Sequence, residues 1–126
     1  MRYAIAAAAS LLLTAAPGHA TQGLLCSPAA GKVPRISLVI GAGGIAGASL
    51  DENGRWVSTM ARGPRLILAQ AWIDRKQVMA DIVSPRWDRI AELRARFDPP
   101  EPRKPRTARG TLTLRGRVIQ VRCVED

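Results

Sequence analysis

Gly110–Cys123 reads G-T-L-T-L-R-G-R-V-I-Q-V-R-C, and this stretch predicts more of the fold than any other part of the chain. Its apolar residues alternate with polar ones on both sides of Arg115-Gly116. A period of two is typical of a half-buried strand, and a glycine in the turn can supply the positive φ that a tight hairpin needs. The stretch therefore predicts a closing β-hairpin.

Residues 1–20 have the pattern of a secretory signal peptide. A positive start is followed by an uncharged run over residues 3–16, a helix-breaking Pro17-Gly18 and small residues at the cleavage position. The run is shorter than the roughly 20 residues that a membrane-spanning helix needs. We therefore expect an exported protein, periplasmic or secreted and not membrane-spanning, with residues 21–126 forming a single β-rich domain.

Two cysteines, Cys26 and Cys123, stand near the two ends of that domain. An even number of cysteines in an exported protein predicts a disulfide. The bridge would tie the first strand to the last, and its loop entropy is worth about 4–5 kcal/mol. Two free thiols are the alternative. Metal binding is disfavoured, because two thiols without a histidine make a poor zinc site.

Most of the remaining domain reads as strands between turns. Asp51–Gly54 and Gly63-Pro64 predict turns. Leu66–Ile73 is apolar on both sides apart from Gln70, which predicts a central strand covered on both faces. Further strands are expected at Arg35–Ile40, Ile45–Leu50, Trp56–Ala61 and Val78–Val83.

A helix is expected over Pro85–Phe97. Ser84 is a favourable N-cap, and proline suits the first helical position. The apolar residues then recur at helical spacing: Trp87, Ile90, Leu93 and Phe97. Seven or eight strands with one helix packed outside predict a mainly β (α+β) fold, either a small antiparallel barrel or a sandwich.

Gly41–Gly47 matches the glycine pattern of dinucleotide-binding proteins. The context argues against that function. A following helix would have only about two turns before Asp51–Gly54, and no acidic residue lies about 20 positions further on. The segment therefore predicts a glycine-rich hairpin loop, and we expect no cofactor.

Catalytic groups are scarce in the domain. The only histidine, His19, and the only tyrosine, Tyr3, lie within residues 1–20. This excludes Ser-His and Cys-His mechanisms and histidine metal sites. Only carboxylates remain, with Asp81 as the one acid inside an expected strand. We therefore expect no catalytic residue and no metal, and a carboxylate-based enzyme is a distant alternative.

Positive charge is the strongest functional signal, with a formal net charge of +9 for the full chain. Residues 98–109 hold four prolines and four basic residues, which predicts an extended, mobile loop. No acid occurs between Pro102 and Val124, and a field of this sign attracts polyanions. The tryptophans are expected mostly in the core, so specific nucleic-acid recognition by stacking is not expected. The candidate anion-binding residues are Arg103, Lys104, Arg106, Arg109, Arg115, Arg117 and Arg122.

The layout resembles small uncharacterised exported proteins of GC-rich proteobacteria, which share a signal peptide, an early cysteine and a closing G-T-L-x-L-x-G-R-x-x-x-V-x-C, here Gly110–Cys123. It also looks like periplasmic inhibitors of C-type lysozyme, which are small disulfide-closed β-barrels. The Ser-Gly-x-x-Tyr stretch of those inhibitors is absent, and a basic chain would be repelled by a cationic enzyme. No site residue is carried over from them.

Together these features predict an exported, non-catalytic envelope-accessory or binding protein with a basic surface. Its expected ligands are anionic envelope polymers or lipid head groups. The alternative is a periplasmic protein-interaction or inhibitor module that uses a loop such as Gly41–Gly44.

Overall fold

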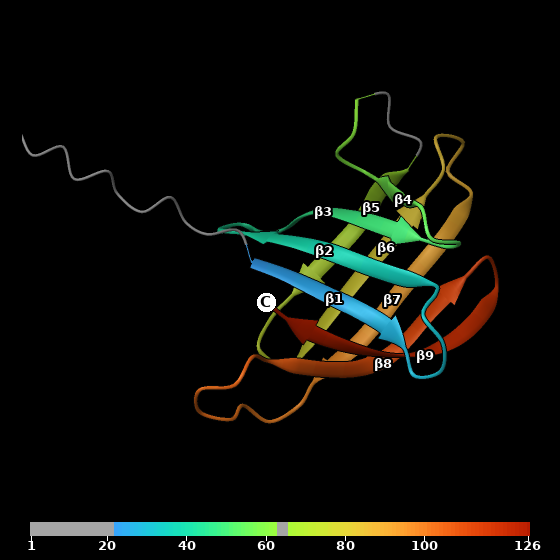
Figure 1. The fold of residues 1–126 in the computed structure, drawn as a ribbon. Coiled ribbons are helices and arrows are strands. Elements are labelled where there is room, and N and C mark those ends of the chain that lie inside the picture. The colour runs from blue at the N-terminus through green and yellow to red at the C-terminus, as the bar shows by residue number, and fades with distance from the viewer. Residues whose placement is uncertain (1–21, 63–65) are drawn as a thin grey trace, which may run out of the picture.

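The computed structural model describes residues 22–62 and 66–126, and its regular structure is all β-strand (Figure 1). The expected signal peptide and the turn at Gly63-Pro64 lie outside the described residues. No helix in the described part of the chain is long and apolar enough to cross a membrane. The strands are β1 (Gln22–Pro28), β2 (Arg35–Gly41), β3 (Gly44–Asp51), β4 (Trp56–Ser58), β5 (Ile67–Ile73), β6 (Gln77–Val83), β7 (Arg89–Phe97), β8 (Thr107–Leu114) and β9 (Arg117–Glu125).

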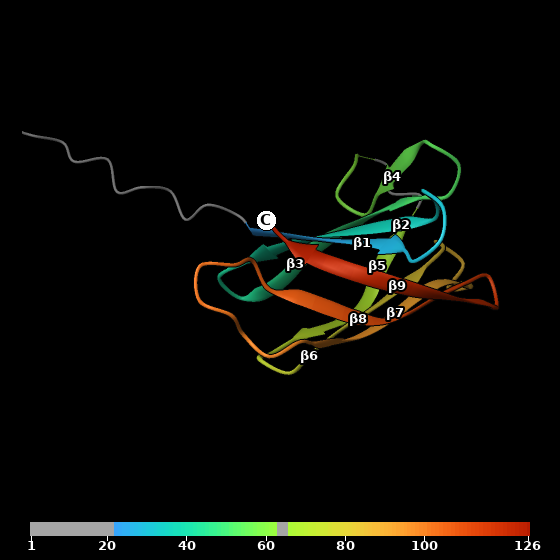
Figure 2. The ribbon, with the colours of Figure 1, turned by 60° about the horizontal axis from the view of Figure 1, so that its bottom comes forward.

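These strands form one antiparallel sheet in the order β4-β3-β2-β1-β9-β8-β7-β6-β5. The sheet consists of two meanders, which are joined where the first strand pairs with the last. It curls until β3 lies against β5, so that β1 to β4 face β6 to β8 (Figure 2). The mainly β prediction is confirmed. The architecture is a half-barrel in which the described residues form nine strands, not the seven or eight expected from the sequence.

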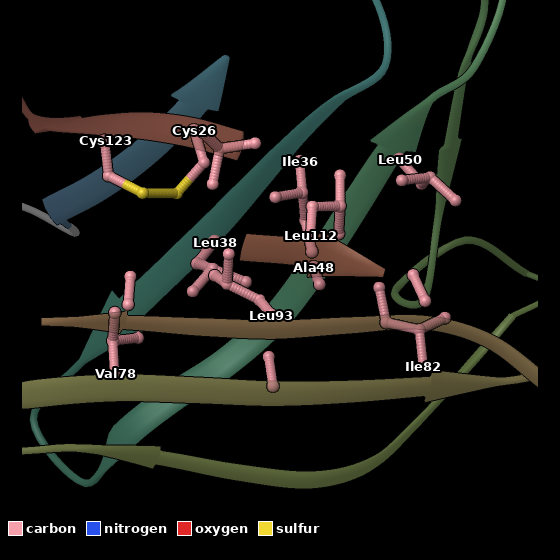
Figure 3. Packing of buried hydrophobic residues seen from close by; sticks show 14 of the residues in the cluster. Cys26, Ile36, Leu38, Ala48, Leu50, Val78, Ile82, Leu93, Leu112 and Cys123 are labelled. Atoms are coloured by element: carbon pink, nitrogen blue, oxygen red, sulfur yellow. A yellow bond between two sulfur atoms is a disulfide. The ribbon is translucent and has the colours of Figure 1, made fainter. Parts of the chain in front are cut away.

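The concave side of this half-barrel holds the hydrophobic core. Leu38, Leu93 and Leu112 are fully buried and come together from β2, β7 and β8 (Figure 3). The predicted disulfide is confirmed. Cys26 and Cys123 are directly opposite each other on β1 and β9, both fully buried, with their Cα atoms 3.9 Å apart. The bridge therefore lies where the two meanders meet.

The helix expected over Pro85–Phe97 is wrong. Ser84 and Asp88 instead close a turn, in which the Ser84 N–H donates to the Asp88 carbonyl at 2.9 Å, and β7 follows directly. Within β7, buried residues alternate with more exposed ones: Ala91, Leu93 and Ala95. The segment carries both a helical spacing and a period of two. Its pairing with β6 on one side and β8 on the other selects the strand.

The expected position of Leu66–Ile73 is also wrong. β5 is an edge strand of the sheet, and Gln70 and Trp72 on it are exposed. The tryptophans expected mostly in the core are all at the surface, where Trp56, Trp72 and Trp87 are 42%, 56% and 69% exposed. Aliphatic and small side chains from both sides of the curl already fill the concave side, which excludes the larger indole rings.

Asp51 is the one buried charged side chain among the described residues. Arg35 donates to its Oδ2 from Nη2 at 2.7 Å and from Nε at 3.2 Å, and the Gly54 N–H donates to its Oδ1 at 2.6 Å. The Arg35 guanidinium in turn lies 4.9 Å from the ring centroid of Trp56. The bonds from Arg35 and Gly54 hold the pKa of Asp51 below its usual value, although burial opposes them.

This lowered pKa predicts acid sensitivity. Ionised Asp51 stabilises the fold above about pH 4, and this stabilisation is lost as the pH falls through the lower, folded-state pKa. We expect Asp51→Asn to lower the urea midpoint at about pH 7. In this variant the urea midpoint should also fall less than in wild type when the pH is lowered to about 3. Asp74 and Asp98, whose pKa values are also lowered, should preserve part of this fall of the midpoint with pH.

Glu101→Gln, in an exposed pair with Lys104, is the control and should barely change the urea midpoint at neutral pH. The same acid sensitivity in wild type and Asp51→Asn would contradict the prediction.

Candidate anion-binding site

The seven basic residues singled out from the sequence divide between the two ends of the half-barrel. Arg115 lies in the β8–β9 turn, and Arg117 begins β9 beside it. The other five lie at or near the opposite end, where the 98–106 loop joins β7 to β8 (Figure 1). Three of them lie in this loop, and two lie on β8 and β9 close to it. Arg109 and Arg115 are six positions apart along extended chain, a distance of about 20 Å. This second group consists of Arg103, Lys104, Arg106, Arg109 and Arg122.

An arginine row crosses three strands on the convex side near the loop. Arg96 on β7 is directly opposite Arg109 on β8, and Arg109 is directly opposite Arg122 on β9. All three side chains are exposed. Neighbouring strands lie about 4.8 Å apart, so the Cα atoms of the three arginines span about 10 Å across the sheet. We call Arg96, Arg109 and Arg122 the arginine row.

Sequence reasoning missed Arg96, because the helix expected over Pro85–Phe97 placed it on a solvated helical face. The signal that could have identified it is the alternation of Glu92, Arg94 and Arg96 with apolar residues. Read as a strand ahead of the 98–106 loop, that alternation brings Arg96 beside β8.

Among the described residues, one carboxylate contacts the arginine row. Asp98 accepts from Arg109 Nε at 3.2 Å through Oδ1 and from the Thr107 hydroxyl at 2.7 Å through Oδ2. The bond from Thr107, followed by the charges of Arg109 and Arg122, holds the pKa of Asp98 below its usual value against the effect of burial. Asp98 therefore offsets one positive charge in a row that carries three.

Several contacts hold the 98–106 loop against the neighbouring strands. Its ends are joined by a bond from the Asp98 N–H to the Thr107 carbonyl at 2.9 Å. Arg106 Nε lies 2.6 Å from Glu125, and its guanidinium lies 4.2 Å from the Phe97 ring centroid. The loop and the start of β8 enclose a hollow of about 440 Å³. Its lining includes Asp98, Pro100, Lys104, Arg106 and Arg109.

Tertiary contacts neutralise several of the basic residues that stand in an acid-free stretch of sequence. Of the seven, four pair with carboxylates that lie outside the acid-free stretch: Lys104 with Glu101, Arg106 with Glu125, Arg109 with Asp98 and Arg115 with Glu52. The hydrogen bonds from Arg115 to Glu52, at 3.0 and 3.3 Å, raise the pKa of Arg115 and join the two turns at the far end. Arg103, Arg117 and Arg122 form no ion pair with a described residue.

Directly opposed like charges destabilise a sheet. The arginine row is such an arrangement, and it leaves guanidinium donors facing solvent. A phosphate or other multivalent anion would accept these donors, often in bidentate pairs, and would relieve the repulsion between neighbours. The row is therefore a candidate site for a phosphate-bearing ligand.

Asp81, the acid singled out from the sequence, is directly opposite Glu92 on β7. Asp81 lies on the convex side of β6, where Arg94 pairs with it at 2.7 Å, and Asp88 lies in the β6–β7 turn. No group of three or more His, Cys, Asp or Glu side chains in residues 22–62 and 66–126 could hold a metal ion. The glycine-rich Gly41–Gly44 forms the tight turn between β2 and β3.

Fold and site together define a small, disulfide-closed antiparallel half-barrel with a row of three exposed arginines on its convex side. Comparison with known proteins finds no matching family model, no similar curated protein and no similar solved structure.

Proposed function

We propose that this protein is an exported, non-catalytic binding protein whose arginine row binds the phosphate groups of an anionic envelope ligand. The observation that supports the proposal is the directly opposed placement of Arg96, Arg109 and Arg122, of which Arg109 alone pairs with a described carboxylate. The adjoining hollow can accept the part of the ligand that is attached to the phosphate. Polyphosphorylated polymers and anionic lipid head groups share this chemistry.

The test replaces all three arginines of the row by glutamine in Arg96→Gln/Arg109→Gln/Arg122→Gln. Binding of linear polyphosphate and of phosphatidylglycerol vesicles is measured against salt concentration, with phosphatidylcholine vesicles as the neutral comparison. We expect wild-type binding to fall steeply with salt, because arginine–phosphate contacts release counterions. The variant should bind roughly tenfold more weakly at low salt, and its log–log salt slope should shrink by up to about 3.

A matched variant removes the same charge from the other end of the half-barrel. Arg55, Arg86 and Arg117 are exposed, form no ion pair with a described residue and lie in or next to the turns at that end. Arg55→Gln/Arg86→Gln/Arg117→Gln should keep most of the wild-type affinity and slope. Equal losses in the two variants would mean that net charge alone attracts the ligand, and the proposal would be wrong.

The two ligand sources separate in the same experiment. Binding to polyphosphate but not to vesicles would identify a soluble or wall-borne phosphate polymer, and the reverse would identify lipid head groups. Absence of binding to both at low salt would refute the anion-binding function. Saturable binding of a protein partner, with an affinity that the substitutions in the row leave unchanged, would favour the alternative, an interaction module at Gly41–Gly44.

A further inference from the structure

A second surface lies on the convex side of β5, β6 and β7. Gln70, Asp81 and Glu92 are directly opposite one another across these strands and form a polar row. A hollow of about 250 Å³ opens at this row, and its lining includes Gln70, Asp81, Glu92, Trp87 and Arg89. We call these five residues, together with Trp72, the tryptophan face.

Trp87 stands at the rim of the hollow and is 69% exposed, more than any other large hydrophobic side chain described. Its backbone has φ 67°, a left-handed conformation that is rare and unfavourable for a bulky residue. The Ser84 carbonyl accepts from the Trp87 N–H at 2.8 Å, and the Ser84 hydroxyl accepts from the N–H groups of Arg86 and Asp88. The turn therefore holds the Trp87 backbone in this conformation beside the hollow that its side chain helps to line, and such strain is concentrated at functional sites.

Trp72 lies on the same face, one row of side chains away on the edge strand β5. It is 56% exposed, and its Nε1 donates to Asp74 at 3.1 Å. Asp74 is itself fixed by the N–H groups of Lys76 and Gln77, at 2.7 and 2.8 Å. A successive row on one face lies about 7 Å along the strand, so Trp72 flanks the polar row on the side away from Trp87.

The charges of the tryptophan face are balanced. Asp81 pairs with Arg94 at 2.7 Å, and Glu92 pairs with Arg89 at 2.9 Å. Each carboxylate retains lone pairs that can accept further hydrogen bonds. This face therefore differs in kind from the arginine row, because it offers acceptors, donors and aromatic rings with no excess charge.

We propose that the tryptophan face binds a neutral oligosaccharide. A sugar ring has an apolar C–H face, which Trp87 can cover, and a rim of hydroxyl groups, which Asp81, Glu92 and Gln70 can bond. Trp72 provides a second ring for a neighbouring sugar. Because Asp74 already holds the Trp72 indole, a ligand loses less binding free energy to the ordering of that side chain. This ligand is distinct from the anion of the proposed function, and it would bind to different residues.

The test is titration calorimetry with three neutral trisaccharides, triacetylchitotriose, maltotriose and cellotriose, at a salt concentration that screens anion binding. At least one should bind wild type, with little dependence on salt. Trp87→Ala should weaken that binding roughly tenfold or more, as truncation of an aromatic anchor does. Trp87→Gly should do the same while accepting the left-handed turn without strain. Gln70→Ala should also weaken binding.

Trp56→Ala is the control, since Trp56 is exposed on β4 beside Arg35 and outside this face. It should bind as wild type does, and so should the triple glutamine variant of the arginine row. Failure of all three sugars to bind, or equal affinity of wild type, Trp87→Ala and Trp87→Gly, would overturn the proposal. Self-association or protein binding that needs Trp87, without any sugar binding, would assign the face to a protein partner instead.

Discussion

The double variant Cys26→Ala/Cys123→Ala should lose about 4–5 kcal/mol of unfolding free energy. The two cysteines are separated by 97 residues in sequence, so the bridge restricts nearly the whole described chain in the unfolded state. A single domain of this size has a total stability of only about 5–15 kcal/mol. The disulfide therefore accounts for a large fraction of it, and the variant should be close to unfolding at physiological temperature.

Urea unfolding of wild type and of the double variant measures this loss. Wild type that is reduced and alkylated in urea and then returned to buffer provides an independent control. It should lose at least as much, because it lacks the cross-link and also carries two alkyl groups on side chains that are fully buried in the native fold. A difference below about 1 kcal/mol would contradict the prediction and would mean that the pairing of β1 with β9 is maintained without the bridge.

Gly110→Ala should lower the free energy of unfolding by about 3 kcal/mol, at the upper end of what overpacking usually costs. Gly110 is directly opposite Ala95 on β7 and Val121 on β9, on the concave side of the sheet. An added Cβ would overlap the Arg94 carbonyl oxygen and would lie 2.6 Å from the Ala95 Cα. Both are backbone atoms, so only a shift of β7 away from β8 could make room.

Gly43→Ala is the matched control. A Cβ at Gly43 would meet nothing within 4 Å, and its φ lies outside the left-handed range. The urea midpoint of this variant should stay near that of wild type, or rise slightly through reduced freedom of the unfolded chain. Equal stability of Gly110→Ala and Gly43→Ala would show that β7 and β8 can separate freely, which would contradict the prediction.

Segments whose partners are close in sequence were predictable. The β8–β9 hairpin within Gly110–Cys123 follows from alternation around Arg115-Gly116, and the turn at Asp51–Gly54 follows from residues that favour it. The pairing of Cys26 with Cys123 was also within reach, because two cysteines allow one intramolecular bridge. Each of these predictions depends on a local pattern or on a choice with one option.

The 85–97 segment shows where local patterns are insufficient. Its leucine and alanine positions suit a strand, while Trp87, Ile90, Leu93 and Phe97 suit a helix face. Pairing with β6 on one side and β8 on the other selects the strand. The residues of the segment alone do not show that these two strands lie beside it. The error then removed Arg96 from the candidate site and placed Trp87 in the core.

The sequence by itself determined the β class, the closing hairpin, the disulfide and the excess of positive charge, since these depend on composition, on period-two alternation or on a single possible pairing. Tertiary structure alone decided which basic residues keep their charge uncompensated. The carboxylates that neutralise Arg106 and Arg115, and the neighbours that align Arg96, Arg109 and Arg122, come from other strands and turns. Electrostatic interactions depend on distance in space, and strand register brings together charges whose proximity no local pattern in the sequence expresses.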